Sequence, residues 1–165
     1  PQDRPLTLLG DEASEANAKR LGPGQTMLHF AVHGLVRDDR PWESALILAP
    51  GDGEDGWLKV PEIFGLDLRA DLVTLSGCST GVGRVSGDGI VGLSRAVIYA
   101  GAPSVLVSQW DVSDVTTAFL MDQFYAGLAA GRSKARSLRD AQLATLKRYP
   151  HPMLWAAFVL VGEPQ

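Results

Sequence analysis

The sequence predicts an α/β fold in which a mostly parallel central sheet has helices on both faces. Two observations support this prediction. Short apolar segments alternate along the chain with longer segments whose apolar residues have helical spacing. Several of the short segments are apolar at successive positions, as strands are when they are buried on both sides. The 165 residues fit one domain, 1–165, and the first residue, Pro1, suggests a fragment of a longer protein.

Six short apolar segments are expected to form strands, because each is rich in valine, leucine or isoleucine and ends at glycine, proline or a polar residue. The second and third of them are separated by a spacer rich in glycine and aspartate, which predicts a hairpin with a long loop. The expected strands are 27–32, 45–49, 57–60, 71–76, 104–108 and 155–161.

Four longer segments are expected to form helices: 11–21, 90–100, 114–130 and 133–149. The first two end at glycine and proline, which are strong stop signals. Pro61 is expected to begin a short helical turn, because proline is favourable at a first helical position. His151 lies between two prolines and is expected to form a turn before the last strand.

Composition excludes several classes of function. The net charge is −4 and the basic residues do not cluster, so no nucleic-acid partner is expected. No apolar run approaches the ~18 residues of a membrane span, and no signal peptide is visible. The single cysteine rules out an internal disulfide and a cysteine-based zinc site, and we expect a reducing, cytoplasmic setting. No metal or other cofactor is expected.

Three of the expected strands end in glycine or polar residues, at His33-Gly34, at Gly77-Cys78 and at 109–111. The carboxyl ends of parallel strands lie at one edge of a sheet, where ligands bind in open α/β sheets. We therefore expect these three segments to meet at one edge.

Cys78 and His33 together indicate a nucleophilic thiol and its acid–base partner. A lone cysteine is most often a buried core residue, and a histidine in a turn is often only solvated. Here Cys78 follows Gly77 at a strand end, where a thiol is accessible and a nearby imidazole can lower its pKa. His33 lies about 45 residues upstream, close to the histidine–cysteine spacing of caspases. The pair favours the catalytic interpretation.

His29 lies four residues before His33, a spacing that would suit a metal pair on a helix. On a strand the two residues are ~13 Å apart, which excludes a chelate. We therefore expect His29 to be a core histidine or one that faces a helix.

Asp111 and Asp114 follow the third strand end. Asp114 is expected to be the N-cap of the next helix. If they face the cleft between the strand ends, either carboxylate could hold a basic side chain of a substrate.

Two short motifs suggest other chemistries. Residues 77–81 match the G-x-S-x-G motif with Ser79 as nucleophile, and Asp111 and His151 follow in the order found in hydrolases. That motif requires a helix directly after the serine, whereas a glycine-rich loop is expected here. Residues 87–92 match a dinucleotide-binding G-x-G-x-x-G, but they lie too far beyond the preceding strand. Both interpretations are weaker than the cysteine one.

Six motifs occur in a specific order: 33–34 (HG), 75–81 (LSGCSTG), 100–103 (AGAP), 109–114 (QWDVSD), 124–125 (FY) and 151–158 (HPMLWAAF). In this combination the chain resembles the CHAT-domain family of caspase-like cysteine peptidases, which are relatives of separase. The resemblance covers about residues 9–162.

The resemblance implies a caspase-like three-layer sandwich and thiol-dependent hydrolysis of peptide bonds. It implies that Cys78 is the nucleophile and that His33 gives a proton to the leaving amine. The backbone amides of Gly34 and Cys78 would form the oxyanion hole. An acid near the Trp-Asp segment, Asp111 or Asp114, would favour a basic residue before the cleaved bond.

The resemblance also implies that the domain lies at the C-terminus of a larger bacterial protein, behind helical repeats that sense a partner. The chain departs from the family in two ways. Ser79 stands where many members have glutamate, although separases tolerate serine there. The strands that normally begin the domain are not found before Asp11, so the fragment is expected to lack a sheet edge.

The sequence therefore predicts a cysteine endopeptidase that acts on a protein or peptide through a Cys–His dyad. The alternatives are a non-catalytic interaction module of the same fold and a serine hydrolase that uses Ser79. The presence of both Cys78 and His33 argues against the interaction module, because a scaffold needs neither.

Overall fold

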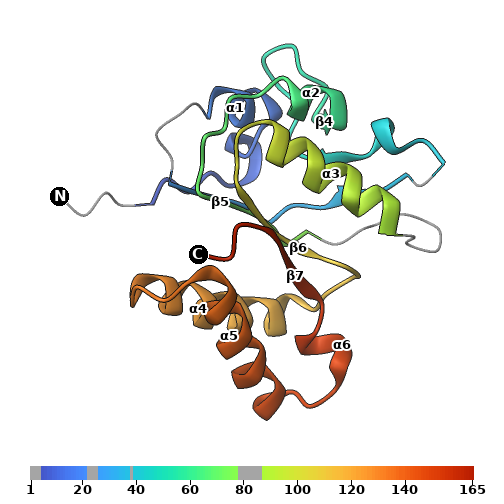
Figure 1. Ribbon diagram of the computed structural model, residues 1–165. Coiled ribbons are helices and arrows are strands. Elements are labelled where there is room, and N and C mark those ends of the chain that lie inside the picture. The colour runs from blue at the N-terminus through green and yellow to red at the C-terminus, as the bar shows by residue number, and fades with distance from the viewer. Residues whose placement is uncertain (1–4, 22–25, 38, 78–86) are drawn as a thin grey trace.

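The computed structural model describes residues 5–21, 26–37, 39–77 and 87–165, and Figure 1 shows how the elements are arranged. In these ranges the strands are β1 (Met27–Phe30), β2 (Gly34–Leu35), β3 (Ala45–Ile47), β4 (Trp57–Lys59), β5 (Leu72–Leu75), β6 (Ser104–Ser108) and β7 (Phe158–Gly162). The helices are α1 (Glu15–Arg20), α2 (Val60–Phe64), α3 (Gly87–Tyr99), α4 (Asp114–Ala129), α5 (Lys134–Arg148) and α6 (Pro152–Trp155), with 3-10 turns η1 (Gly10–Glu12) and η2 (Pro41–Glu43).

The main sheet has four strands in the order β1-β5-β6-β7. β1 pairs with β5 and β5 with β6 in parallel, and β7 pairs with β6 antiparallel. A separate antiparallel sheet has the order β2-β3-β4. The predicted α/β fold with a mostly parallel sheet is confirmed, as is the predicted hairpin of β3 and β4. The caspase-like three-layer sandwich stays a prediction.

Alternate side chains of the central strands pack into two apolar clusters. Val73 of β5 belongs to the cluster that contains Val97 of α3. The neighbouring Leu72 belongs to the other cluster, which contains the fully buried Phe124 of α4. In Figure 1, α4 and α5 lie on the opposite side of the sheet from α2 and α3. β5 and β6 are buried at every residue, which explains why most of their side chains are aliphatic.

Helix α5 shows how an amphipathic stripe fixes a helix on the sheet. Leu138, Ala141 and Thr145 form its buried stripe. Gln142, on the same stripe, donates a hydrogen bond of 3.0 Å to the carbonyl oxygen of Phe158 in β7. Ser133 caps the helix by accepting a hydrogen bond from Arg136 N. Within the described ranges, no helix combines the length and the hydropathy that a membrane span requires.

The last strand begins at Phe158, so the predicted start at residue 155 is wrong. Residues Pro152–Trp155 form the short helix α6 instead. His151 caps α6, because its Nδ1 accepts a hydrogen bond of 3.3 Å from Met153 N. The same Pro152 that suggested a turn is favourable in the first turn of a helix.

Three further features differ from the predictions. Helix α3 begins at Gly87, so the glycines of the G-x-G-x-x-G motif lie in a helix and cannot form a phosphate-binding turn. Ser113 is the N-cap of α4, although its side chain makes no capping hydrogen bond, so the prediction that Asp114 caps this helix is wrong. Asp114 is the first helical residue, where its charge interacts favourably with the helix dipole. Strand β2 is not predicted, because its two residues are too few to show the alternation of apolar and polar residues that marks a strand.

A cluster of charged side chains holds α1 against the hairpin. Lys19 Nζ lies 2.7 Å from a carboxylate oxygen of each of Glu15, Glu54 and Glu62. Glu15 is 1% exposed, and its second oxygen accepts a hydrogen bond of 2.7 Å from Gly56 N. Burial opposes the charge on Lys19, but hydrogen bonds to the three carboxylates raise its pKa well above the ordinary value. The ammonium group therefore neutralises carboxylates that would otherwise repel one another.

We expect Lys19→Ala to lower the free energy of unfolding by roughly 2–3 kcal/mol, because it leaves the buried Glu15 carboxylate without its cation. Urea denaturation at neutral pH measures this change. Lys59→Ala is the matched control, since Lys59 forms an ion pair with Asp55 at the surface and its loss should change stability little. Equal stability of the two variants would contradict the importance of the cluster.

Candidate active site

The carboxyl ends of β1, β5 and β6 lie at the same edge of the sheet. The three strands are parallel, and their last paired residues are in register, Phe30 with Leu75 and Leu75 with Val107. β1 leads into the segment that contains His33, β5 leads into Gly77, and β6 leads into residues 109–111. The predicted meeting of these segments at one edge is confirmed for the residues that the structure describes.

Gly77 lies directly against the backbone of the His33 segment. A Cβ atom at Gly77 would overlap the carbonyl oxygen of Val32 and would lie 3.3 Å from His33 N. Just before this contact, Ser76 N donates a hydrogen bond of 3.1 Å to the carbonyl oxygen of Phe30. The absence of a side chain at Gly77 thus lets two segments that are distant in the sequence touch.

The small antiparallel sheet fixes the backbone of His33 from the other side. The carbonyl oxygen of His33 accepts a hydrogen bond of 2.8 Å from Ile47 N, and the next residue, Gly34, is paired with Leu46 of β3. The side chain of His33 is exposed. The structure therefore places the backbone of His33, a residue with an exposed side chain, beside the segment that follows β5. Cys78 and Ser79 lie outside the described residues.

His29 faces helix α4, as the sequence predicts, and does not pair with His33. Its Nε2 lies 2.7 Å from Ser76 Oγ, and its Nδ1 lies 3.2 Å from the hydroxyl of Tyr125. The Tyr125 hydroxyl donates a further hydrogen bond of 2.9 Å to Thr74 Oγ1. Although part of the His29 ring is exposed, the surrounding protein displaces water from it and lowers its pKa below 6.5. No sequence pattern identifies Ser76 and Thr74 as members of this hydrogen-bonded group.

The third strand end is held by main-chain and indole hydrogen bonds. Gln109 N donates to the carbonyl oxygen of Ala157 at 2.8 Å, and Trp110 Nε1 donates to that of Met153 at 3.0 Å. Asp111 and Asp114, on the segment that follows, are both exposed. Their carboxylates are accessible to a ligand, and a role in substrate binding stays a prediction.

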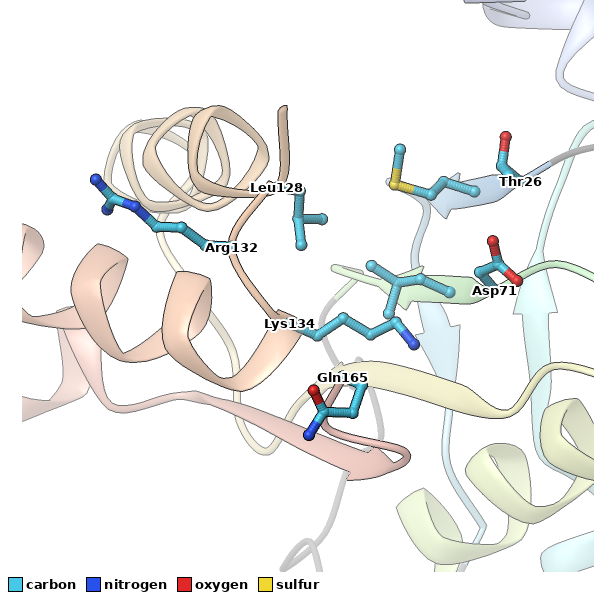
Figure 2. A pocket seen from close by; sticks show the side chains of 8 residues that line it. Thr26, Asp71, Leu128, Arg132, Lys134 and Gln165 are labelled. Atoms are coloured by element: carbon cyan, nitrogen blue, oxygen red, sulfur yellow. The ribbon is translucent and has the colours of Figure 1, made fainter. Parts of the chain in front are cut away.

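A cavity of about 220 Å³ lies at the other end of the sheet (Figure 2). Thr26 and Asp71, which precede β1 and β5, line it together with Lys134 of α5. Because the cavity lies where the parallel strands begin, it is separate from the edge that carries His33. Its lining contains no histidine or cysteine within the described residues. We therefore place the candidate active site at the carboxyl ends of the strands.

The CHAT domain family, a caspase-related family, matches residues 3–163. The chain therefore belongs to the CHAT domain family. The match extends slightly beyond the residues 9–162 over which the motifs resemble that family.

Two curated relatives are large proteins named for tetratricopeptide repeats. Tetratricopeptide repeat protein 28 of Mus musculus is 36% identical over 108 residues, which are 64% of this chain. Tetratricopeptide repeat protein 28 of Homo sapiens is 33% identical over 108 residues. The chain spans only 4% of the length of either relative. The predicted association of this domain with repeats in longer proteins is thus seen in its relatives.

We expect Gly77→Ala to lower the free energy of unfolding by roughly 2–3 kcal/mol, because the added methyl group would overlap the Val32 carbonyl. Thermal or urea denaturation measures the change. Gly92→Ala is the matched control: it lies in α3 and its added Cβ would come no closer than 3.8 Å to Pro41.

In the control variant, the higher helix propensity of alanine should leave stability unchanged or raise it by up to about 1 kcal/mol. Wild-type stability of Gly77→Ala would contradict the close contact between the two segments.

Proposed function

We propose that this CHAT domain is a cysteine endopeptidase that cleaves protein or peptide substrates, with Cys78 as nucleophile and His33 as its acid–base partner. The observation that supports the proposal best is the contact between Gly77 and the Val32–His33 backbone. Gly77, the residue directly before Cys78 in the sequence, lies against the backbone of Val32 and His33. Membership of a caspase-related family supports the same assignment.

The proposed reaction has two steps. The Cys78 thiolate attacks the carbonyl carbon of the substrate and forms a carbon–sulfur bond. The carbon–nitrogen bond then breaks, and the leaving amine takes a proton from the His33 imidazolium. In the second step, His33 accepts a proton from water as the water attacks the thioester. The carbon–sulfur bond breaks, the acid product leaves, and the Cys78 thiolate and the His33 imidazolium are restored. No metal or organic cofactor takes part in this scheme.

The amides of Gly34 and Cys78 are the proposed oxyanion hole. Backbone amides near a strand end can stabilise the negative oxygen of the tetrahedral intermediate. The exposed carboxylates of Asp111 and Asp114 lie on the segment beyond β6 and are the candidates to bind a basic side chain before the cleaved bond. This preference would make the specificity resemble that of separases.

The larger setting is also part of the proposal. We propose that the domain adopts the caspase-like three-layer sandwich and works in the cytoplasm, where a lone thiol stays reduced. Helical repeats or a partner protein would regulate its activity in a longer chain. The names of the two relatives support this view, because both are called tetratricopeptide repeat proteins.

A non-catalytic interaction module is the second candidate. The observation that favours it is that the names of the relatives state repeats and no enzymatic activity. A serine hydrolase that uses Ser79 is a weaker candidate. The motif requires His151 as a base, and the described His151 side chain instead caps α6.

We expect Cys78→Ala and His33→Ala each to lower cleavage by about 10³-fold or more, because each removes one member of the dyad. Ser79→Ala should leave cleavage within a few-fold of wild type. Mass spectrometry of a peptide library incubated with the full-length protein, in the presence of its regulatory partner, measures cleavage and its site preference. Loss of cleavage in Ser79→Ala alone would favour the serine hydrolase.

Thiol labelling separates the peptidase from the interaction module. The sequence has a single cysteine, so any adduct on this domain reports Cys78. A peptide with a thiol-reactive group should label wild type rapidly and His33→Ala slowly, because the imidazole promotes thiolate formation. Equal labelling rates together with no cleavage by the wild type would support the interaction module.

A further inference from the structure

The side of the sheet that faces α4 carries polar side chains close to the candidate active site. Thr74 is fully buried, and Ser76 is 9% exposed. Farther along β5, Leu72 on the same side lies in an apolar cluster. Buried polar groups lower stability unless they are hydrogen-bonded, and aliphatic side chains would fill the same positions without that cost. We therefore infer that Thr74 and Ser76, at the end of β5, have a role in addition to packing.

The hydrogen bonds link four side chains in one continuous chain. The Tyr125 hydroxyl donates to Thr74 Oγ1 and lies 3.2 Å from Nδ1 of His29. Nε2 of the same ring lies 2.7 Å from the Ser76 hydroxyl. A neutral imidazole has one donor and one acceptor nitrogen, so it can bond to both hydroxyls at once. The surrounding protein displaces water from the ring and lowers the pKa of His29, which favours this neutral form.

This chain joins the two strands that lead into the proposed catalytic segments. His29 lies on β1, which continues to His33, and Ser76 is the residue before Gly77. The backbone hydrogen bond from Ser76 to Phe30 links the same two strands at this level. The side-chain bond of His29 adds a second link there, and Tyr125 anchors the ring to α4. A change of ~1 Å in the separation of catalytic groups can lower a rate about 10²-fold.

We propose that His29 is a positioning residue for the peptidase reaction: by binding Ser76 and Tyr125, it holds the end of β5 against β1 and so fixes the segments that carry the proposed dyad. The inference rests on the proposed function. His29 acts through Ser76 and does not touch the substrate. Its contribution should therefore appear in kcat, while KM for the peptide stays nearly constant.

Two substitutions of His29 separate its two hydrogen bonds. Glutamine places an amide near the position of Nε2 and can still reach Ser76, whereas asparagine places it near Nδ1 and reaches only Tyr125. We expect His29→Asn to lower kcat about 10- to 100-fold with KM changed less than about two-fold. We expect His29→Gln to stay within about five-fold of wild type. The measurement is steady-state cleavage of a peptide by the full chain.

Tyrosine variants and folding measurements complete the test. Tyr125→Phe removes the hydroxyl that anchors His29 and should lower kcat, whereas Tyr99→Phe is the control, because Tyr99 is 75% exposed. Thermal midpoints are measured for every variant. A purely structural role predicts that kcat follows the thermal midpoint. The positioning role predicts that the two His29 variants differ in kcat even where their midpoints agree.

The ¹⁵N shifts of the histidine rings give a readout that does not depend on activity. His29 should show a neutral ring in which one tautomer predominates, and Tyr125→Phe should shift the Nδ1 signal. Wild-type cleavage that depends on Cys78, combined with an unchanged kcat in His29→Asn, would overturn the positioning role alone. Absence of Cys78-dependent cleavage in the wild type would overturn the proposed function and the positioning role with it.

Discussion

The close approach of Gly77 to the Val32–His33 backbone is the constraint on which the candidate active site depends. Parallel strands bring their carboxyl ends to one edge but leave several ångströms between the segments that follow. Here the segment after β5 packs against the segment after β1 with no side chain between them. The backbone of His33 is also tied to β3, so it is held from both sides. The sheet thus fixes the main-chain positions of His33 and Gly77 at the candidate active site.

The rest of the molecule supports this edge from two directions. On one side, the ion pairs of Lys19 join α1 to the hairpin of β3 and β4, which is the hairpin that pairs with β2 next to His33. On the other side, α4 contributes Tyr125 to the polar chain beneath the ends of β1 and β5. Polar and charged contacts, as well as apolar packing, therefore decide the geometry near the site.

The sequence predicts most of the fold because burial leaves a strong periodic signal. The bounds predicted for β6 agree with the structure, since a run of buried aliphatic residues between glycine–proline and polar segments has few alternatives. The beginnings of α3 and β7 are predicted poorly. Glycines at the start of α3 resemble a loop, and Pro152 suits both a turn and a first helical turn. Tertiary contacts decide between such choices, and local sequence does not contain them.

The candidate site is predictable only in part, for a related physical reason. His33 and Gly77 lie where strands end in glycine, a pattern that the sequence displays. The bond between His29 and Ser76 joins residues 47 positions apart, and the bond between His29 and Tyr125 joins residues 96 apart. Side-chain hydrogen bonds between residues so far apart leave no repeating pattern in the local sequence, so they cannot be predicted from it. They emerge only once strand order and register are known.

The antiparallel direction of β7 has a practical consequence for joining this domain to other proteins. Because β7 runs against β6, Gly162 returns to the level of Ser104, where β6 begins, and Glu163 N is hydrogen-bonded to Pro103. The final residue, Gln165, lines the cavity at that end of the sheet (Figure 2). A fluorophore attached after Gln165 would therefore begin at the end of the sheet opposite His33, away from the candidate active site.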